Sequence, residues 1–147
     1  MKIIARSLIM LSLMVPSVSH AGETPSAPGA KVFFVNLKDG DTVTSPFKVE
    51  FGVEGMAIVP AETDQANSGH HHLFINRPAL GKTEDGADEL SNTIIKDEKN
   101  LHFGKGQTDT MVELPPGQHT LQMVLGDKDH IPHNPPLATE VITITVK

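Results

Sequence analysis

Histidine is the residue type in this chain whose number and spacing indicate a chemical role. Seven of the eight histidines lie between positions 70 and 133. They are His70, His71, His72, His102, His119, His130 and His133. A chain without Cys, Trp or Tyr has no packing reason to concentrate imidazoles in this way. Because neutral imidazole is the commonest protein ligand for zinc, copper, nickel and iron, the pattern predicts a transition-metal site.

If the run of three histidines lies on a β-strand, its first and third members are spaced so that both could bind one metal ion. Residues two apart on a strand share a face and lie about 7 Å from each other, so His70 and His72 could converge on one ion. His71 would point to the opposite face with Leu73 and Ile75, and we expect it to be structural. The alternative for His70 and His72 is an exposed strand face that binds no metal.

Three further histidines are candidate ligands. His130 and His133 lie in a loop with three prolines, which would hold donor atoms with little entropy left to lose. His102 precedes two glycines that permit close backbone approach. Asp127 or Gln107 could orient a ligand imidazole by hydrogen bonding. We expect the ligands at a solvent-accessible rim, so that losing one would hardly change the stability of the metal-free domain.

His119 has a structural interpretation. It follows the turn formed by Pro115, Pro116 and Gly117, and it shares a strand face with apolar residues such as Leu121. In immunoglobulin-like sandwiches this corner often carries a Tyr whose hydroxyl bonds to nearby backbone. Because a His could make the same hydrogen bond, we predict that His119 stabilises the fold and does not bind metal.

The first residues predict export from the cell. Lys2 and Arg6 flank the start of a short apolar run that ends at Pro16, and Ser19-His20-Ala21 carries the small residues that a signal peptidase reads. Such a run is too short to span a membrane. Cleavage after Ala21 is the favoured position. Cleavage after Ser19 is the alternative, and it would expose His20 as an N-terminal ligand.

The remaining organisation follows from composition. We expect residues 1–21 to be a signal peptide, 22–30 a flexible tether rich in Pro, Gly and Ser, and 31–147 a single domain. Loss of two cationic residues with the signal peptide changes the formal charge from −6 to −8. An acidic domain is a poor partner for nucleic acid or an anionic membrane, since both require a basic face.

The fold is expected to be all-β. Residues 47–54 alternate between apolar and polar, as a half-buried strand does, and similar short segments recur between turns rich in Gly and Pro. Six or more such strands predict an immunoglobulin-like antiparallel β-sandwich. The exception is one long irregular loop, about 77–107, in which a helical turn near 85–90 fits the sequence. A loop of this length is usually functional or mobile.

Common catalytic motifs are absent from the sequence. It contains no Gly-x-Ser-x-Gly elbow of a serine hydrolase and no His-Glu-x-x-His segment of a zinc protease. The glycine-containing segment 101–108 lacks the arrangement of a phosphate-binding loop.

Several motifs together resemble a known group of proteins. They are Gly69-His70-His71-His72-Leu73, His102-Phe103-Gly104-Lys105-Gly106-Gln107-Thr108, the run 116–127 from Pro-Gly-Gln-His to Leu-Gly-Asp, and His130-Ile131-Pro132-His133. In combination they are similar to a family of small exported bacterial proteins of unknown function, which implies a periplasmic β-sandwich. At the level of the fold, the chain also resembles periplasmic copper-resistance sandwiches of the CopC type. Their copper site uses an N-terminal His, which this chain would lack after cleavage at Ala21.

The sequence therefore predicts a periplasmic protein that binds a transition metal for carriage or sequestration. All-imidazole donors in oxidising surroundings favour copper as Cu(II), with zinc next in the affinity order. The predicted ligands are drawn from His70, His72, His102, His130 and His133. Two alternatives remain: a metal-dependent enzyme with an open coordination position, and a structural or interaction module without metal.

Overall fold

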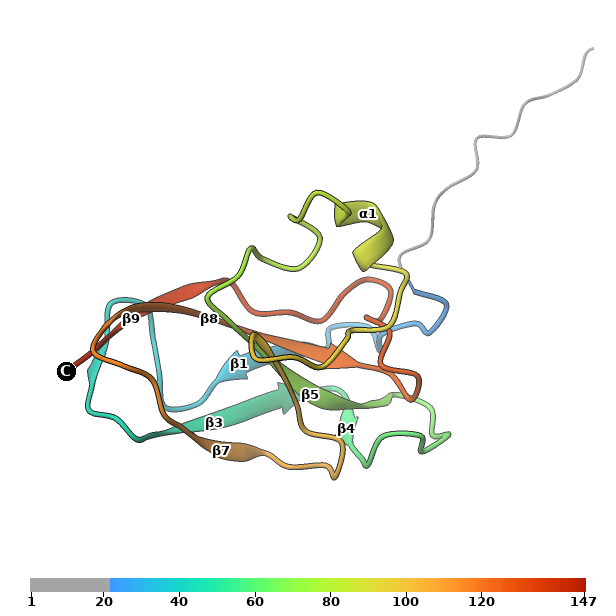
Figure 1. Ribbon diagram of the computed structural model, residues 1–147. Helices are drawn as coiled ribbons and strands as arrows, with labels where there is room; N and C mark the ends of the chain where they lie inside the picture. Colours follow the sequence, from blue (N-terminus) through green and yellow to red (C-terminus); the bar gives the residue numbers. More distant parts are fainter. Residues whose placement is uncertain (1–21) are drawn as a thin grey trace, which may run out of the picture.

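The computed structural model describes residues 22–147, which form two β-sheets and one short helix (Figure 1). The elements are β1 (Lys31–Phe34), β2 (Thr42–Val43), β3 (Phe47–Glu54), β4 (Ala57–Ile58), β5 (Ser68–Ile75), α1 (Gly86–Glu89), β6 (Asn100–His102), β7 (Asp109–Val112), β8 (Gly117–Gly126) and β9 (Ile142–Val146). The expected signal peptide, 1–21, lies outside the described residues. Within 22–147, no helix has the length and apolar character needed to cross a membrane.

The two sheets differ in size. The smaller has the strand order β1-β3-β7, and the larger has the order β2-β9-β8-β5-β4, with β6 also paired to β5. This arrangement confirms the predicted all-β sandwich. Two pairings depart from the antiparallel order, because β2 runs parallel to β9 and β4 runs parallel to β5. Both β2 and β4 are two-residue edge strands that no tight hairpin joins to their partners, so hairpin geometry does not impose an antiparallel direction.

The core lies between the sheets and follows the alternation of the strands. Strand β3 contributes the inward side chains of Phe47, Val49 and Phe51, as its alternating sequence predicts. Strands β5, β8 and β9 face them with their own alternate residues. These are Leu73, Ile75, Leu121, Met123, Leu125, Ile142, Ile144 and Val146.

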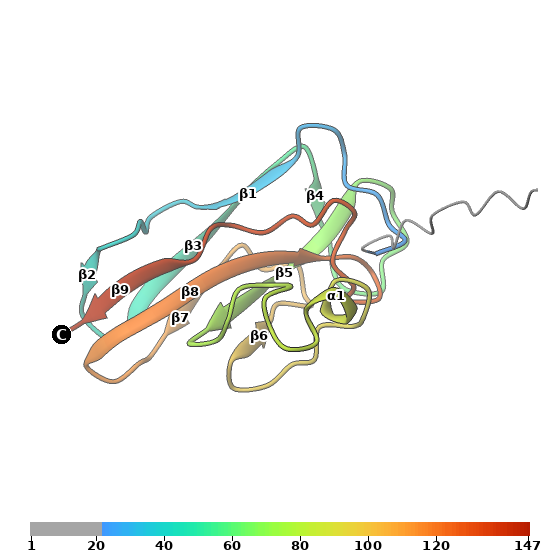
Figure 2. The same cartoon turned by 90° about the horizontal axis from the view of Figure 1, so that it is seen from above.

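A second, smaller apolar cluster lies on the outer face of the larger sheet. Here the segment 77–99 folds back over β5 and β8 (Figures 1 and 2), and Ile94 packs against Phe74 and Val124. The Arg77 guanidinium carbon lies 4.1 Å from the centre of the Phe74 ring, and this side chain also pairs with Glu89 of α1. Because one face of β5 packs in the core and this segment covers the other, all eight residues of β5 are buried.

The expected irregular loop, 77–107, is partly regular. It contains α1, near the expected helical turn, and β6, which pairs with β5 through residues 100–102. The sequence did not show β6 as a strand because it is only three residues long, too short for an alternation to be seen.

The segment 22–30, expected to be a flexible tether, has a defined place in the structure. The backbone amide of Asn134 donates to the carbonyl oxygen of Thr24, and the amide of Ser26 donates to that of Asn134. The Thr24 hydroxyl also donates to the carboxylate of Asp127 over 2.6 Å. These hydrogen bonds hold segment 22–30 against the proline-rich loop. The composition of the segment does not predict these contacts.

Candidate metal centre

The pleat of β5 divides its three histidines between the two faces of the larger sheet. His71 points into the core, where its ring centre lies 5.0 Å from that of Phe51. His70 and His72 point to the outer face, on the same side as Phe74. His72 is directly opposite His102 of β6, and paired residues of neighbouring strands project to the same face. The sheet therefore brings three imidazoles together on one face.

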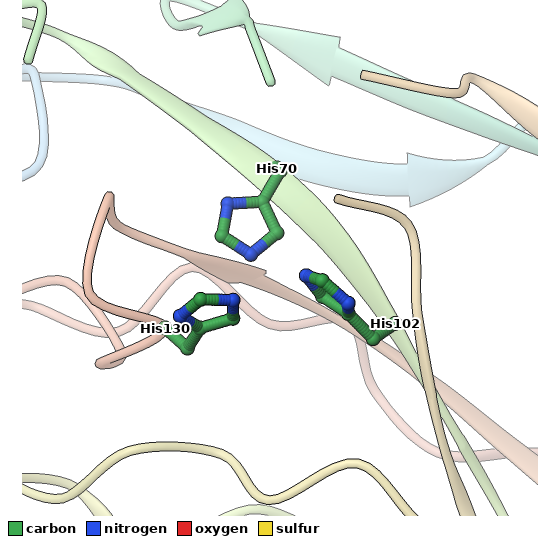
Figure 3. A group of neighbouring side chains, drawn as sticks. All are labelled: His70, His102 and His130. Carbon is green, nitrogen blue, oxygen red and sulfur yellow. The ribbon is translucent and has the colours of Figure 1, made fainter. Parts of the chain in front are cut away.

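His130 completes the histidine cluster, which we define as His70, His72, His102 and His130. Donor nitrogens of His70, His102 and His130 all lie within 4.8 Å of one another. Figure 3 shows these three rings around a common space, each with a nitrogen directed toward it. The fourth ring adjoins them, because Nε2 of His72 lies 3.1 Å from Nε2 of His70.

The loop that carries His130 is held by hydrogen bonds. One carboxylate oxygen of Asp127 accepts the amides of Asp129 and Ile131 over 2.9 Å each. His130 between them adopts a left-handed conformation with φ of 67°, which is uncommon for residues other than glycine. Its carbonyl oxygen accepts the amide of Ile94 from the covering segment. The imidazole is thus held in position by backbone contacts on two sides.

Two glycines make room for the rings. A Cβ atom on Gly104 would lie 2.3 Å from Cε1 and 2.6 Å from Nε2 of His102. A Cβ atom on Gly126 would lie 2.8 Å from Nε2 of His72. Neither glycine has a positive φ, so backbone conformation does not require glycine at these positions. The need for space beside an imidazole ring does.

The environment disfavours protonation of three histidines in the cluster. Burial, and then the neighbouring His130 and His102, lower the pKa of His70 from 6.5 to about 4. Burial, and then His70, lower the pKa of His72 to about 2. The pKa of His102 is lowered in the same way, by burial first and by His130 second. Because only the neutral imidazole can coordinate a metal, these lowered pKa values favour the coordinating form of His70, His72 and His102.

Unsatisfied nitrogens accompany this arrangement. Within residues 22–147, every buried side-chain N or O atom that has no hydrogen-bond partner belongs to a histidine. The atoms are Nδ1 of His70, both ring nitrogens of His71, Nδ1 of His72 and Nε2 of His102. Buried polar groups are normally hydrogen-bonded, and each exception requires an explanation. For Nε2 of His102, a member of the cluster, a bound metal ion would supply one.

The expected solvent-accessible rim is not what the structure shows. The side chains of His70 and His72 are fully buried, and His102 and His130 are partly buried. The reason is the segment 77–99, which covers the outer face of the sheet. Substitution of His70 or His72 should therefore affect folding as well as metal binding.

The structure does not bring His133 into the cluster. It is fully buried, with Nδ1 at 3.3 Å from the carbonyl oxygen of Leu125 and Nε2 at 3.1 Å from that of Ser68. Both nitrogens face backbone carbonyls, so neither is directed at a metal position. His133 instead links the end of β8 to the start of β5.

The two residues expected to orient a ligand differ in their positions. Asp127 is buried and acts on His130 through the backbone of the loop, with no hydrogen bond to an imidazole. Gln107 is exposed, and its side-chain oxygen accepts the backbone amide of Lys105. The geometry gives Asp127 a positioning role and leaves Gln107 outside the site.

His119 lies away from the cluster, at the corner before β8. Its Nε2 donates to the carbonyl oxygen of Pro115 and its Nδ1 accepts from the side-chain amide of Asn76, both over 2.8 Å. With both nitrogens hydrogen-bonded, His119 has no donor atom free for a metal. His71 is also separate from the site, because it points to the core face of β5.

Comparison with known proteins places the chain in a family. The model of a domain of unknown function, DUF4399, matches residues 49–147. The chain belongs to the DUF4399 family. The DUF4399 match contains all four histidines of the cluster, together with both glycines and Asp127, whereas β1 and β2 precede it. Comparison with curated proteins finds no match, and comparison with solved structures finds none either.

Sequence reasoning missed several residues that shape the site in this DUF4399 chain. Gly126 is one of them, because it leaves space for the His72 ring, whereas the close approach allowed by the glycines after His102 was expected from the sequence. Ile94 and Thr24 contact the His130 loop from distant segments. No local pattern marks these contacts, because they depend on how the chain folds back on itself.

Proposed function

We propose that this protein binds a transition-metal ion through His70, His102 and His130, and that it carries or sequesters the ion in the bacterial periplasm. The observation that carries this proposal is the convergence of three imidazole nitrogens within 4.8 Å. Three such donors are enough to anchor zinc or copper. The affinity order places copper first and zinc next among the candidate ions.

Two further features support binding over a purely structural role. The cluster buries one nitrogen each of His70, His72 and His102 without a hydrogen-bond partner, an arrangement that costs stability unless another ligand is present. The left-handed His130 lies at this cluster, and backbone strain is commonly found at ligand-binding positions.

Calorimetric titration of the chelator-treated protein, purified without a His tag, tests the proposal. We expect one Cu(II) or Zn(II) ion per chain. His102→Ala should weaken binding with little effect on the fold, since this side chain is only partly buried. His130→Asn should do the same, because Asn tolerates the left-handed backbone that this position requires.

The matched control is His119→Gln, which removes an imidazole from outside the cluster. It should bind the metal as the wild-type protein does. Equal loss of binding in all three variants, or no binding by the wild-type protein, would contradict the proposal.

A further inference from the structure

The fourth imidazole of the cluster decides what kind of metal site this is. Three histidines alone would leave one coordination position open to water or substrate, as in catalytic zinc sites. His72 is the nearest candidate for a fourth ligand, since its Nε2 is 3.1 Å from Nε2 of His70. Its ring centre is also 5.1 Å from that of His102.

The ring-centre distances among the four imidazoles are close to those of tetrahedral coordination, while the nitrogens that already lie within 4.8 Å of one another are those of His70, His102 and His130. With metal–nitrogen bonds of about 2.05 Å, a tetrahedral site places donor nitrogens about 3.3 Å apart and imidazole centres about 5.2 Å apart. The six centre-to-centre distances in the cluster run from 4.7 to 6.0 Å. The one nitrogen pair in hydrogen-bond range, at 3.1 Å, is also near the tetrahedral value.

A square-planar arrangement does not fit the same distances. In a square-planar site the four rings form two pairs, and the two rings of each pair lie on opposite sides of the metal. With the same bond length, the ring centres in each pair would be about 6.4 Å apart. His72 and His130 are 6.0 Å apart, but the complementary pair, His70 and His102, is only 5.0 Å apart. The other two ways of choosing opposite pairs give distances no greater than 5.1 Å.

The protein around the rings opposes a change to the flatter geometry. His72 is fully buried, and the Gly126 backbone lies so close that a Cβ atom there would be 2.8 Å from its Nε2. His70 is fully buried on the same strand. Because packed interiors resist such rearrangement, two of the four rings have little freedom to move.

We infer that His72 completes a closed, four-imidazole tetrahedral site that takes a d10 ion, Zn(II) or Cu(I), in preference to tetragonal Cu(II). This inference rests on the proposed metal-binding function and goes beyond it in naming the fourth ligand, the geometry and the class of ion. A d10 ion has no geometric preference of its own, whereas Cu(II) favours a tetragonal field. With four protein ligands the site has no position for a substrate, so its role is carriage or storage.

Cobalt substitution tests the geometry directly, because tetrahedral Co(II) absorbs visible light far more strongly than octahedral Co(II). The wild-type protein loaded with Co(II) should show the intense spectrum, and added azide should leave it unchanged. His72→Leu should bind Zn(II) about 10–100-fold more weakly. Its Co(II) spectrum should change when azide binds at the vacated position.

His71→Leu is the matched control, because His71 is the next residue on the strand, equally buried, and faces the core. It should keep the wild-type Zn(II) affinity and Co(II) spectrum. If His72→Leu does not fold, X-ray absorption of the wild-type zinc complex decides the point, with four imidazole nitrogens expected and no oxygen ligand.

Competition titrations with Zn(II) and with Cu(I) under reducing conditions identify which d10 ion binds more tightly. Metal binding by the wild-type protein together with an azide-sensitive Co(II) spectrum would overturn the four-ligand site and leave the proposed function standing. An ordinary tetragonal Cu(II) paramagnetic resonance signal from the fully loaded protein would overturn the geometry in the same way. Failure of the wild-type protein to bind any of these ions would overturn both.

Discussion

Acid should destabilise the metal-free domain, and His71 accounts for a part of this effect that can be measured separately. Burial lowers the pKa of His71 from 6.5 to about 4, and no other cause contributes to that shift. Below pH 6.5 the unfolded chain takes up a proton that the folded domain does not. Stability is therefore complete above pH 6.5 and is lost as the pH falls from 6.5 through 4.

The size of the effect follows from the shift. For one group with a folded pKa near 4, lowering the pH from 7 to 5 costs about 2 kcal/mol of unfolding free energy. His70 and His72 act in the same direction, since their pKa values are also lowered. His71→Leu should remove the contribution of His71 alone. At pH 7 this variant should also be more stable by about 1–3 kcal/mol, because two buried nitrogens without partners are removed.

Urea unfolding of both chelator-treated proteins at pH 7 and pH 5 provides the measurement. The wild-type protein should lose about 2 kcal/mol more than His71→Leu between the two pH values. An equal loss in both proteins would show that His71 can be protonated in the folded domain, and the argument from its burial would then be refuted.

Three other substitutions separate the site from the fold. Gly104→Ala should weaken Zn(II) binding by about 10–100-fold in calorimetry, because the new methyl group displaces the partly exposed His102 ring. The free energy of unfolding should stay near that of the wild-type protein. An unchanged Zn(II) affinity would contradict the role given to the space beside Gly104. Asp127→Ala should lower the free energy of unfolding by about 3 kcal/mol through lost hydrogen bonds to a buried carboxylate, and should weaken metal binding by releasing His130. A stability loss without a change in affinity would limit Asp127 to folding. His119→Ala should cost about 1–3 kcal/mol in urea unfolding with unchanged metal affinity, and loss of the metal would place His119 in the site.

The strand pattern was enough to separate the three adjacent histidines. Alternation on β5 predicted that His70 and His72 share a face and that His71 points toward the core, and the structure has this arrangement. The all-β sandwich was predictable for the same reason, since side-chain period is a local property. The participation of His102 and His130 in the site was a hypothesis drawn from residue type.

Features that depend on distant contacts could not be predicted. The segment 77–99 buries His70 and His72, yet its polar sequence gives little sign of the contact that Ile94 makes with Phe74. His133 has the same residue type and loop setting as His130. Only the folded chain shows that its nitrogens face carbonyl oxygens.

The position of a bound metal ion tests the central claim most directly. Crystals of the protein soaked with Zn(II), with data collected on both sides of the zinc absorption edge, would reveal the ion by its anomalous scattering. We predict one strong peak per chain, about 2.0–2.1 Å from a ring nitrogen of each of His70, His102 and His130. A peak elsewhere on the surface, or no peak among these three imidazoles at full zinc occupancy, would contradict the account.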